Sequence, residues 1–327
     1  MDKRTKNKKR ILLTNPKEVR FFATLGFVLA IFLTITFVFG SRVHRGEVSN
    51  PSKVVVPGPY DSLELTAKAA YVYDIRTGQV LFSKNEIKRL PLASLTKVMS
   101  ALVALETAPA GTTIQITDAS LTPEGDSGLL VGETWNLKDL LDFSLTSSSN
   151  DGMHAIALSI GALNKSNPTD TEAGSDFIMM MNKKARDINM KNTYYYNETG
   201  LDQTSQKGGA YGSAEDMAKL FEYILKNHPN LLEATSENKI RVLSLDNFNH
   251  TAVSTNLIVD DIPGIKASKT GFTDIAGGNL VVAFDPELGR PIIISVLGST
   301  QDDRFLDMKK LIEKTLEVIQ IEPTPKK

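Results

Sequence analysis

The sequence predicts a mixed α/β fold of the α+β type, in which an antiparallel sheet is flanked by helices and an all-helical subdomain is inserted between its strands. Three observations support this fold class. Strand patterns occur near both ends of residues 65–321, helical patterns fill the part between them, and short turns join successive strands. Strands that are joined by short turns pair in the antiparallel direction.

The strand patterns come in two pairs. Residues 69–85 contain two runs rich in Val, Tyr and Phe around a turn at Thr77-Gly78, which predicts a hairpin. Residues 277–285 and 291–299 are apolar runs separated by a turn over residues 286–289. Because the two pairs lie at opposite ends of the region, the sheet is expected to take strands from both.

Helical spacing of apolar residues dominates the middle of the chain. Residues 94–106 predict a buried helix. Its apolar side consists of Leu95, Val98, Met99, Leu102 and Leu105. Further helical patterns lie at residues 137–147, 150–163, 176–188 and 213–227, and residues 304–319 predict a closing amphipathic helix.

Composition excludes several kinds of site. The chain has 327 residues, of which 41% are hydrophobic and 23% charged, as in an ordinary globular protein. A formal net charge of −1 gives no indication of a nucleic-acid partner. The chain has no cysteine, which excludes disulfides, thiolate metal sites and a cysteine nucleophile.

The amino-terminal region has the pattern of a signal anchor. Residues 21–40 are a charge-free apolar run, and a helix of that length crosses the roughly 30 Å hydrocarbon core of a bilayer. Lys and Arg are abundant before the run and sparse after it, so the positive-inside rule places residues 1–20 in the cytoplasm. The expectation is a single-pass protein of the cell membrane that contacts the lipid bilayer through residues 21–40, with a cleaved signal peptide as the alternative.

The predicted domain organisation follows from these patterns. Residues 41–64 contain Pro51, Pro57, Gly58 and Pro59 with few periodic apolar positions, which predicts a stalk. The expected parts are a cytoplasmic basic segment (1–20), a transmembrane anchor (21–40), the stalk (41–64), a folded domain (65–321) and a tail (322–327).

A candidate nucleophile opens the helix predicted over residues 94–106. Ser94 and Lys97 are three residues apart, so their side chains share one helix face. A serine hydroxyl attacks once a base takes its proton, and Lys97 is such a base when burial keeps its amine neutral. Residues 236–239 have the same Ser-x-x-Lys spacing but lie in a polar stretch.

A second motif, Ser148-Ser149-Asn150, separates two predicted helices. Ser148 is a candidate for relaying a proton to a leaving amine. Asn150 is a candidate for binding a substrate amide. The alternative is that these residues only cap a helix, as Ser and Asn often do.

A third motif, Lys269-Thr270-Gly271, precedes the strand pattern at 277–285. A lysine beside a hydroxyl suits a substrate carboxylate, and Gly271 allows the strand to approach another element closely. Side chains alternate along a strand, so Lys269 and Thr270 reach one substrate only if this is a twisted edge strand. An exposed turn is the alternative.

In this order the three motifs resemble the active site of the penicillin-recognising serine enzymes. More narrowly, the chain is similar to the D-alanyl-D-alanine carboxypeptidases among the low-molecular-mass penicillin-binding proteins. Further similar stretches are residues 71–106, SSSNDGMHAIA, NETGLD, YGSAEDMAKL and KASKTGFTDIAGGNLVVA. The resemblance extends over about residues 65–320 and implies a β-lactamase/transpeptidase-like fold.

The resemblance also implies a mechanism that requires no metal and no cofactor. Ser94 would attack the carbonyl between the last two D-alanines of a peptidoglycan stem peptide while Lys97 takes its proton. The backbone N–H groups of Ser94 and Phe272 would form the oxyanion hole, and Ser148 would return a proton to the leaving D-alanine.

The same resemblance implies the binding roles. Lys269, Thr270 and Gly271 would bind the terminal carboxylate of a stem peptide that ends in D-Ala-D-Ala, and Asn150 would bind its backbone. β-Lactams would act as inhibitors that acylate Ser94.

The chain departs from the family pattern in three respects. Ser149 stands where the family often has glycine, and Glu198 stands where it often has proline. About seven residues follow the last predicted helix, so the second, β-rich domain and the C-terminal amphipathic anchor common in the family are expected to be missing.

Five alternative functions stay open. A DD-endopeptidase or a transpeptidase would use the same site on the same substrate. A class A-like β-lactamase shares the motifs but needs a glutamate for deacylation, a pattern that Glu198 imitates loosely. A non-catalytic sensor would carry degraded motifs. A Ser-His-Asp hydrolase would need one of the four histidines; of these, His154 is expected to pack on its own helix.

Overall fold

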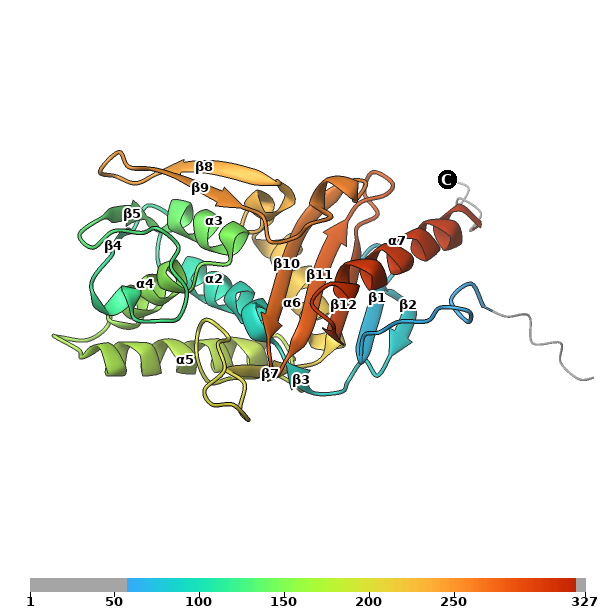
Figure 1. The fold of residues 1–327 in the computed structure, drawn as a ribbon, viewed down its shortest axis with the longest axis horizontal. Helices are drawn as coiled ribbons and strands as arrows, with labels where there is room; N and C mark the ends of the chain where they lie inside the picture. Colours follow the sequence, from blue (N-terminus) through green and yellow to red (C-terminus); the bar gives the residue numbers. More distant parts are fainter. Residues whose placement is uncertain (1–57, 322–327) are drawn as a thin grey trace, which may run out of the picture. The chain divides into compact units, whose positions relative to one another are not determined.

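A five-stranded antiparallel sheet organises the described part of the chain, residues 58–321 of a computed structural model (Figure 1). Its strand order is β10-β11-β12-β1-β2. β1 (Ala69–Asp74) and β2 (Gln79–Lys84) form the first predicted hairpin, and β11 (Gly277–Phe284) and β12 (Ile292–Ser299) form the second. β1 pairs with β12, so the sheet joins strands from both ends of the region, as predicted.

Each face of the sheet packs against different helices. Val282 and Ile294 lie in one apolar cluster with Met308 of α7 (Asp303–Ile321), which covers that face. Val281 and Ile293, one position away in each strand, belong to a larger cluster with α2 (Thr96–Thr107) and α6 (Ala214–Asn227). This alternation is the period-two pattern of a sheet buried on both faces.

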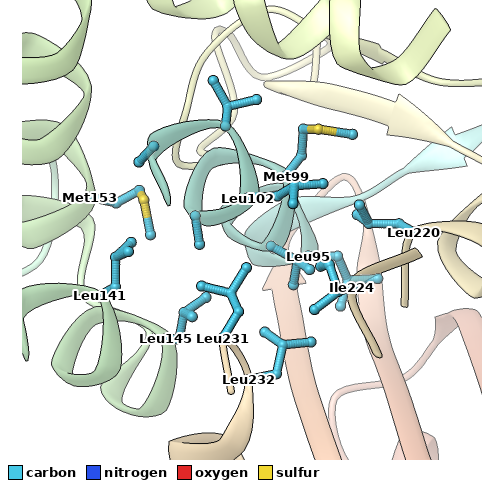
Figure 2. Packing of buried hydrophobic residues seen from close by; sticks show 14 of the residues in the cluster. Leu95, Met99, Leu102, Leu141, Leu145, Met153, Leu220, Ile224, Leu231 and Leu232 are labelled. Carbon is cyan, nitrogen blue, oxygen red and sulfur yellow. The ribbon is translucent and has the colours of Figure 1, made fainter. Parts of the chain in front are cut away.

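α2 is the central helix of the helical block. It packs against α3 (Leu137–Ser147), α4 (Asn150–Gly161) and α5 (Asp170–Asp187). Figure 2 shows its residues Met99 and Leu102, and Leu95 in the turn just before it, among side chains of the neighbouring helices, which include Leu141, Leu145, Met153, Leu220 and Ile224. Apolar neighbours on several sides explain why the pattern at 94–106 is apolar almost all round.

Two local features differ from the sequence patterns. The sequence pattern at residues 213–227 predicts a helix of the helical block, but the helix observed there, α6, contacts β1 and β12 of the main sheet. The hairpin of β8 (Lys239–Leu243) and β9 (Asn249–Val253) was not predicted. Its strands are short and mostly exposed, and only Ile240, Val242 and Ala252 supply apolar contacts to the core.

Short elements complete the described residues. β3, β7 and β6 form a three-stranded sheet, and β4 and β5 form a two-stranded one. Their bounds are β3 Leu90–Pro91, β4 Thr113–Gln115, β5 Thr134–Asn136, β6 Tyr194–Tyr195 and β7 Ala210–Gly212. The 3₁₀ helices in this part of the chain are η1 Ala93–Leu95, η2 Ala119–Leu121, η3 Glu233–Ser236 and η4 Val259–Asp261.

β10 (Ile265–Thr273) pairs only with β11 and is an edge strand of the main sheet. It contacts η1, the short turn that leads into α2, and the two lie next to each other in Figure 1. The edge strand of the main sheet is therefore in contact with the turn at which the central helix starts.

The predicted single-pass location in the cell membrane requires a correction. Within residues 58–321, no helix combines the length and the apolar character needed to cross a membrane. The predicted anchor at 21–40 lies outside the described residues, as do the basic segment 1–20 and the tail 322–327. Contact with a lipid bilayer therefore has no support from the described residues.

Part of the predicted stalk is described. Tyr60 is buried, its ring packs on Phe82, and its hydroxyl lies 2.9 Å from the Thr315 hydroxyl of α7. The boundary predicted at residue 65, like the other domain boundaries, stays a prediction.

Candidate active site

Ser94 and Lys97 meet at the start of α2. Ser94 lies in η1, and α2 begins at Thr96, so the predicted helix start is a 3₁₀ turn. Lys97 Nζ donates hydrogen bonds to Ser94 Oγ at 2.9 Å and to the Thr199 carbonyl oxygen at 2.8 Å. Ser94 is partly exposed, whereas Lys97 is fully buried.

The surroundings of Lys97 favour its neutral form. Burial lowers the pKa of Lys97 to about 7, and the negative charge of Glu198 acts in the opposite direction. A large share of the molecules near neutral pH therefore carries an uncharged amine. Its lone pair can accept the proton of Ser94, as the activation of a serine nucleophile requires.

Ser148 is placed by the junction between α3 and α4. Its φ of 62° lies in the left-handed region, which ends α3 and is strained for a residue other than glycine. The helix cap is Ser149, whose Oγ accepts a hydrogen bond from Gly152 N at 3.0 Å. The capping alternative thus applies to Ser149, and the hydroxyl of Ser148 is available to the site.

Lys269 connects β10 to this junction. Lys269 Nζ donates to Ser148 Oγ at 2.9 Å and to the Thr270 carbonyl oxygen at 3.0 Å. Burial holds the pKa of Lys269 well below its usual value, and the positive charges of Lys97 and Arg304 lower that pKa further. An anionic group that binds beside Lys269 would favour its protonated form.

The other predicted binding residues have internal partners. Thr270 Oγ1 lies 2.5 Å from Thr255 Oγ1. Asn150, the first residue of α4, donates from Nδ2 to the Glu124 carbonyl oxygen at 2.6 Å. A hydroxyl and an amide each have further hydrogen-bonding positions, so both groups can bind substrate beside these partners.

Gly271 marks the point where β10 passes against η1. A Cβ atom at this position would lie 2.8 Å from the Leu92 carbonyl oxygen and 3.2 Å from the Ser94 nitrogen. Only glycine avoids these contacts without movement of the backbone. The next residue, Phe272, is 41% exposed. Ser94 and Phe272 therefore belong to neighbouring backbone segments, and their role as an oxyanion hole stays a prediction.

A loop over residues 197–202 supplies the carbonyl partner of Lys97. Asn197 closes the loop, since its Oδ1 accepts from Gly200 N at 2.7 Å and its Nδ2 donates to the Leu201 carbonyl oxygen at 2.8 Å. Gly200 has a φ of +83°, and a Cβ there would lie 1.9 Å from the Ala93 carbonyl oxygen. This stretch is part of the predicted resemblance and contains the Glu198 that loosely imitates a β-lactamase pattern; an Asn followed three residues later by Gly was the signal for such a turn.

We expect Gly200→Ala to disturb both stability and the site. The left-handed backbone and the contact with the Ala93 carbonyl together should cost about 2–4 kcal/mol of unfolding free energy. Urea unfolding measures this difference. Gly111→Ala is the matched control, because a Cβ at Gly111 meets nothing within 4 Å. Equal stability of the two variants would contradict the close packing of the loop on η1.

The structure thus places two hydroxyl–amine pairs, Ser94 with Lys97 and Ser148 with Lys269, close enough for the charge of Lys97 to lower the pKa of Lys269. Within residues 58–321, no group of three or more His, Cys, Asp or Glu side chains is positioned to hold a metal ion. The chemistry available to these four side chains is nucleophilic attack with proton transfer between hydroxyl and amine.

A sequence model of the family described as D-alanyl-D-alanine carboxypeptidase matches residues 55–301. The chain belongs to this family. The predicted resemblance is therefore confirmed. The matched region contains all three motifs of this D-alanyl-D-alanine carboxypeptidase family member.

Curated relatives carry names from the same family. The D-alanyl-D-alanine carboxypeptidase DacF of Bacillus subtilis is 30% identical over 269 residues, which cover 80% of this chain and 65% of that protein. A D-alanyl-D-alanine endopeptidase of Pseudomonas aeruginosa is 31% identical over 228 residues, which cover 67% of each protein. The chain of this family member thus spans about two thirds of the length of the relatives it matches.

Solved structures confirm the predicted fold. Penicillin-Binding Protein D2 of Listeria monocytogenes, in its ampicillin-bound form, has a TM-score of 0.65 and 28% identity, and the match covers 78% of this carboxypeptidase family member and 99% of that chain. A mutant of a Streptomyces DD-transpeptidase has a TM-score of 0.69 at 22% identity, covering 78% and 99% of the two chains, and supports the fold alone.

Proposed function

We propose that this chain is a serine-type D-alanyl-D-alanine carboxypeptidase that trims the terminal D-alanine from peptidoglycan stem peptides of the bacterial cell wall. One observation carries the proposal: Ser94 Oγ lies 2.9 Å from the amine of a fully buried Lys97, whose pKa is about 7. Membership of the family supplies the substrate class.

The first step is acylation. Lys97 takes the hydroxyl proton of Ser94 while Oγ bonds to the carbonyl carbon of the penultimate D-alanine. The oxygen of that carbonyl becomes an oxyanion, for which the backbone N–H groups of Ser94 and Phe272 are the proposed donors. Each such donor is typically worth about 3 kcal/mol of barrier. The close approach of Gly271 to the Ser94 nitrogen supports this assignment.

The second step expels the leaving group. The C–N bond breaks, and the proton held by Lys97 passes through the hydroxyl of Ser148 to the nitrogen of the departing D-alanine. Lys269, which donates to Ser148 Oγ, orients this relay. A water molecule then attacks the ester, releases the shortened peptide and restores Ser94.

Substrate binding is assigned to residues of β10 and of the start of α4. Lys269 and Thr270 would hold the terminal carboxylate, whose charge favours protonation of Lys269. Asn150, whose Nδ2 donates to the Glu124 carbonyl, would bind the peptide backbone with the other hydrogen-bonding positions of its amide. β-Lactams are proposed as inhibitors that acylate Ser94, which is in keeping with the ampicillin-bound and cefotaxime-bound forms of the Listeria relative.

The test is release of D-alanine from a pentapeptide stem that ends in D-Ala-D-Ala. The full chain should produce one tetrapeptide for each D-alanine released. The same peptide ending in L-Ala-L-Ala is the control and should stay intact. Absence of D-alanine release at any substrate concentration, from a folded protein, would contradict the proposal.

A second candidate function is DD-endopeptidase activity. It is favoured by the Pseudomonas relative named as an endopeptidase, which is 31% identical to this chain. The two activities differ in the leaving group. A carboxypeptidase releases a single D-alanine, whereas an endopeptidase releases the stem peptide that supplies the amine of a cross-link. A cross-linked stem-peptide dimer that is split into monomers faster than free D-alanine appears would favour the endopeptidase.

A further inference from the structure

Glu198 and His154 form a pair beside Lys97 that the proposed mechanism does not use. Glu198 Oε1 lies 2.8 Å from His154 Nδ1. Glu198 is 6% exposed, and the His154 side chain is 22% exposed. In the sequence, Glu198 is a departure from the family pattern, and His154 is expected to pack on its own helix. The structure instead joins them across 44 residues of chain.

The pair connects two parts of the site. His154 lies on α4 four residues after Asn150, so the two side chains share one helix face, one turn apart. Glu198 lies on the loop that Asn197 closes. The contact therefore ties the helix proposed to bind substrate to the loop whose carbonyl binds Lys97.

The backbone of Glu198 is also hydrogen-bonded to α2. The Glu198 carbonyl oxygen accepts a hydrogen bond from Ser100 Oγ at 2.7 Å, and the next carbonyl, that of Thr199, accepts from Lys97 Nζ at 2.8 Å. Lys97 and Ser100 are three residues apart on one face of the helix. A displacement of Glu198 would therefore move both carbonyls relative to the amine.

Other charged groups act on the neighbouring amine. The positive charges of Lys97 and of Arg304, at the start of α7, lower the pKa of Lys269 on β10, and Arg304 donates to the Gly271 carbonyl oxygen at 2.9 Å. Asp202, on the same loop, accepts from Thr273 on β10. Among the described groups, Glu198 is the charged side chain that raises the pKa of Lys97 against the effect of burial.

We propose that Glu198, held by His154, is a positioning residue that keeps the loop carbonyls hydrogen-bonded to α2, and that its carboxylate raises the pH at which Lys97 accepts the proton of Ser94. The inference rests on the proposed function, since it assumes that Lys97 is the base. A proline at position 198 could supply neither the charge nor the contact with His154.

The test is the rate at which a fluorescent penicillin acylates the full chain, measured from about pH 5 to 9. The rate of the wild type should rise with pH as Lys97 loses its proton. Glu198→Gln keeps the shape of the side chain and a hydrogen-bonding group for His154 but removes the charge. The acidic side of its rate–pH profile, called the acid limb below, should move to lower pH by about one unit. The negative charge of Glu198 favours the protonated amine of Lys97, so its removal should lower the pKa of that amine.

Two further variants separate charge from structure. Glu198→Asp retains the charge, so its acid limb should stay closer to that of the wild type than the limb of Glu198→Gln does. His154→Gln retains a donor for the carboxylate but cannot become positively charged, so its acid limb should stay in place or move to higher pH. These two variants also test the inference if Glu198→Gln fails to fold.

Glu133→Gln is the matched control. Glu133 Oε1 lies 2.6 Å from His250 Nε2, and both side chains are largely buried. This substitution removes the same charge from a second Glu–His pair, one that does not act on Lys97. Its acid limb should coincide with that of the wild type.

The outcomes distinguish the two proposals. A wild-type chain that is not acylated at any pH would overturn the proposed function itself. Acylation of the wild type with an unmoved or raised acid limb in Glu198→Gln would overturn only this inference. The inference also falls if Glu198→Gln leaves the acylation profile unchanged and abolishes penicillin hydrolysis, because Glu198 would then serve deacylation, as in a class A-like β-lactamase.

Discussion

Ser94→Ala is expected to abolish covalent labelling by a fluorescent penicillin and to lower the release of D-alanine by a factor of about 10⁴ or more. The hydroxyl of Ser94 is the only hydroxyl bonded to the amine of Lys97 among the described residues. Without it no ester with the substrate can form. Labelling followed by intact-mass measurement, together with a D-alanine assay, checks both parts of the prediction.

The control for this substitution is Ser236→Ala. Ser236 opens the second Ser-x-x-Lys sequence of the chain, but its Oγ donates to the Glu233 carbonyl oxygen at 2.7 Å and its surroundings are exposed. Ser236→Ala should therefore be labelled at the wild-type rate. Continued labelling of Ser94→Ala, or its loss in Ser236→Ala, would place the nucleophile elsewhere. Both variants should unfold at wild-type urea concentrations, because neither side chain is in the core.

The contacts within one helix turn could be predicted from the sequence. Ser94 and Lys97 meet because residues three apart share a helix face, and that geometry does not depend on the rest of the fold. The edge position of β10 was stated as a condition for the Lys-Thr-Gly motif, and the strand order satisfies it. Local patterns sufficed for the two hairpins of the main sheet and for the central helix, because each of these signals lies within a short stretch of sequence.

Contacts between distant parts of the chain could not be predicted from local patterns. The bond of Lys97 to the Thr199 carbonyl spans 102 residues, and the bond of Lys269 to Ser148 spans 121. No periodicity encodes such pairings, and only the resemblance linked the three motifs. The contact between Glu198 and His154 could be predicted neither from periodicity nor from the resemblance, because the family pattern has proline at position 198. This contact was missed because a charged residue stands where the family usually has an apolar one.

Lys97→Arg is the second substitution with a large expected effect. Arginine keeps the positive charge and much of the length, but its guanidinium does not lose a proton in the accessible pH range. It therefore cannot accept the proton of Ser94, and acylation by a fluorescent penicillin should fall by a factor of about 10³ or more. The wild-type rate should rise with pH through about 7, the pKa of Lys97, whereas the rate of Lys97→Arg should stay low up to about pH 10.

Lys97→Met separates the loss of the base from the effect of a buried charge. Methionine fills a similar volume and is neutral, so it removes the base without forcing a cation into a fully buried position. It should acylate as slowly as Lys97→Arg but unfold at a higher urea concentration, because the guanidinium cannot become neutral as the lysine does. The wild type should also gain stability between about pH 7 and 10, where the unfolded lysine still binds a proton that the folded one has lost, and Lys97→Met should lack that contribution. Rapid acylation of Lys97→Met would show that another group takes the proton, and the hydrogen bond between Ser94 and Lys97 would then be structural.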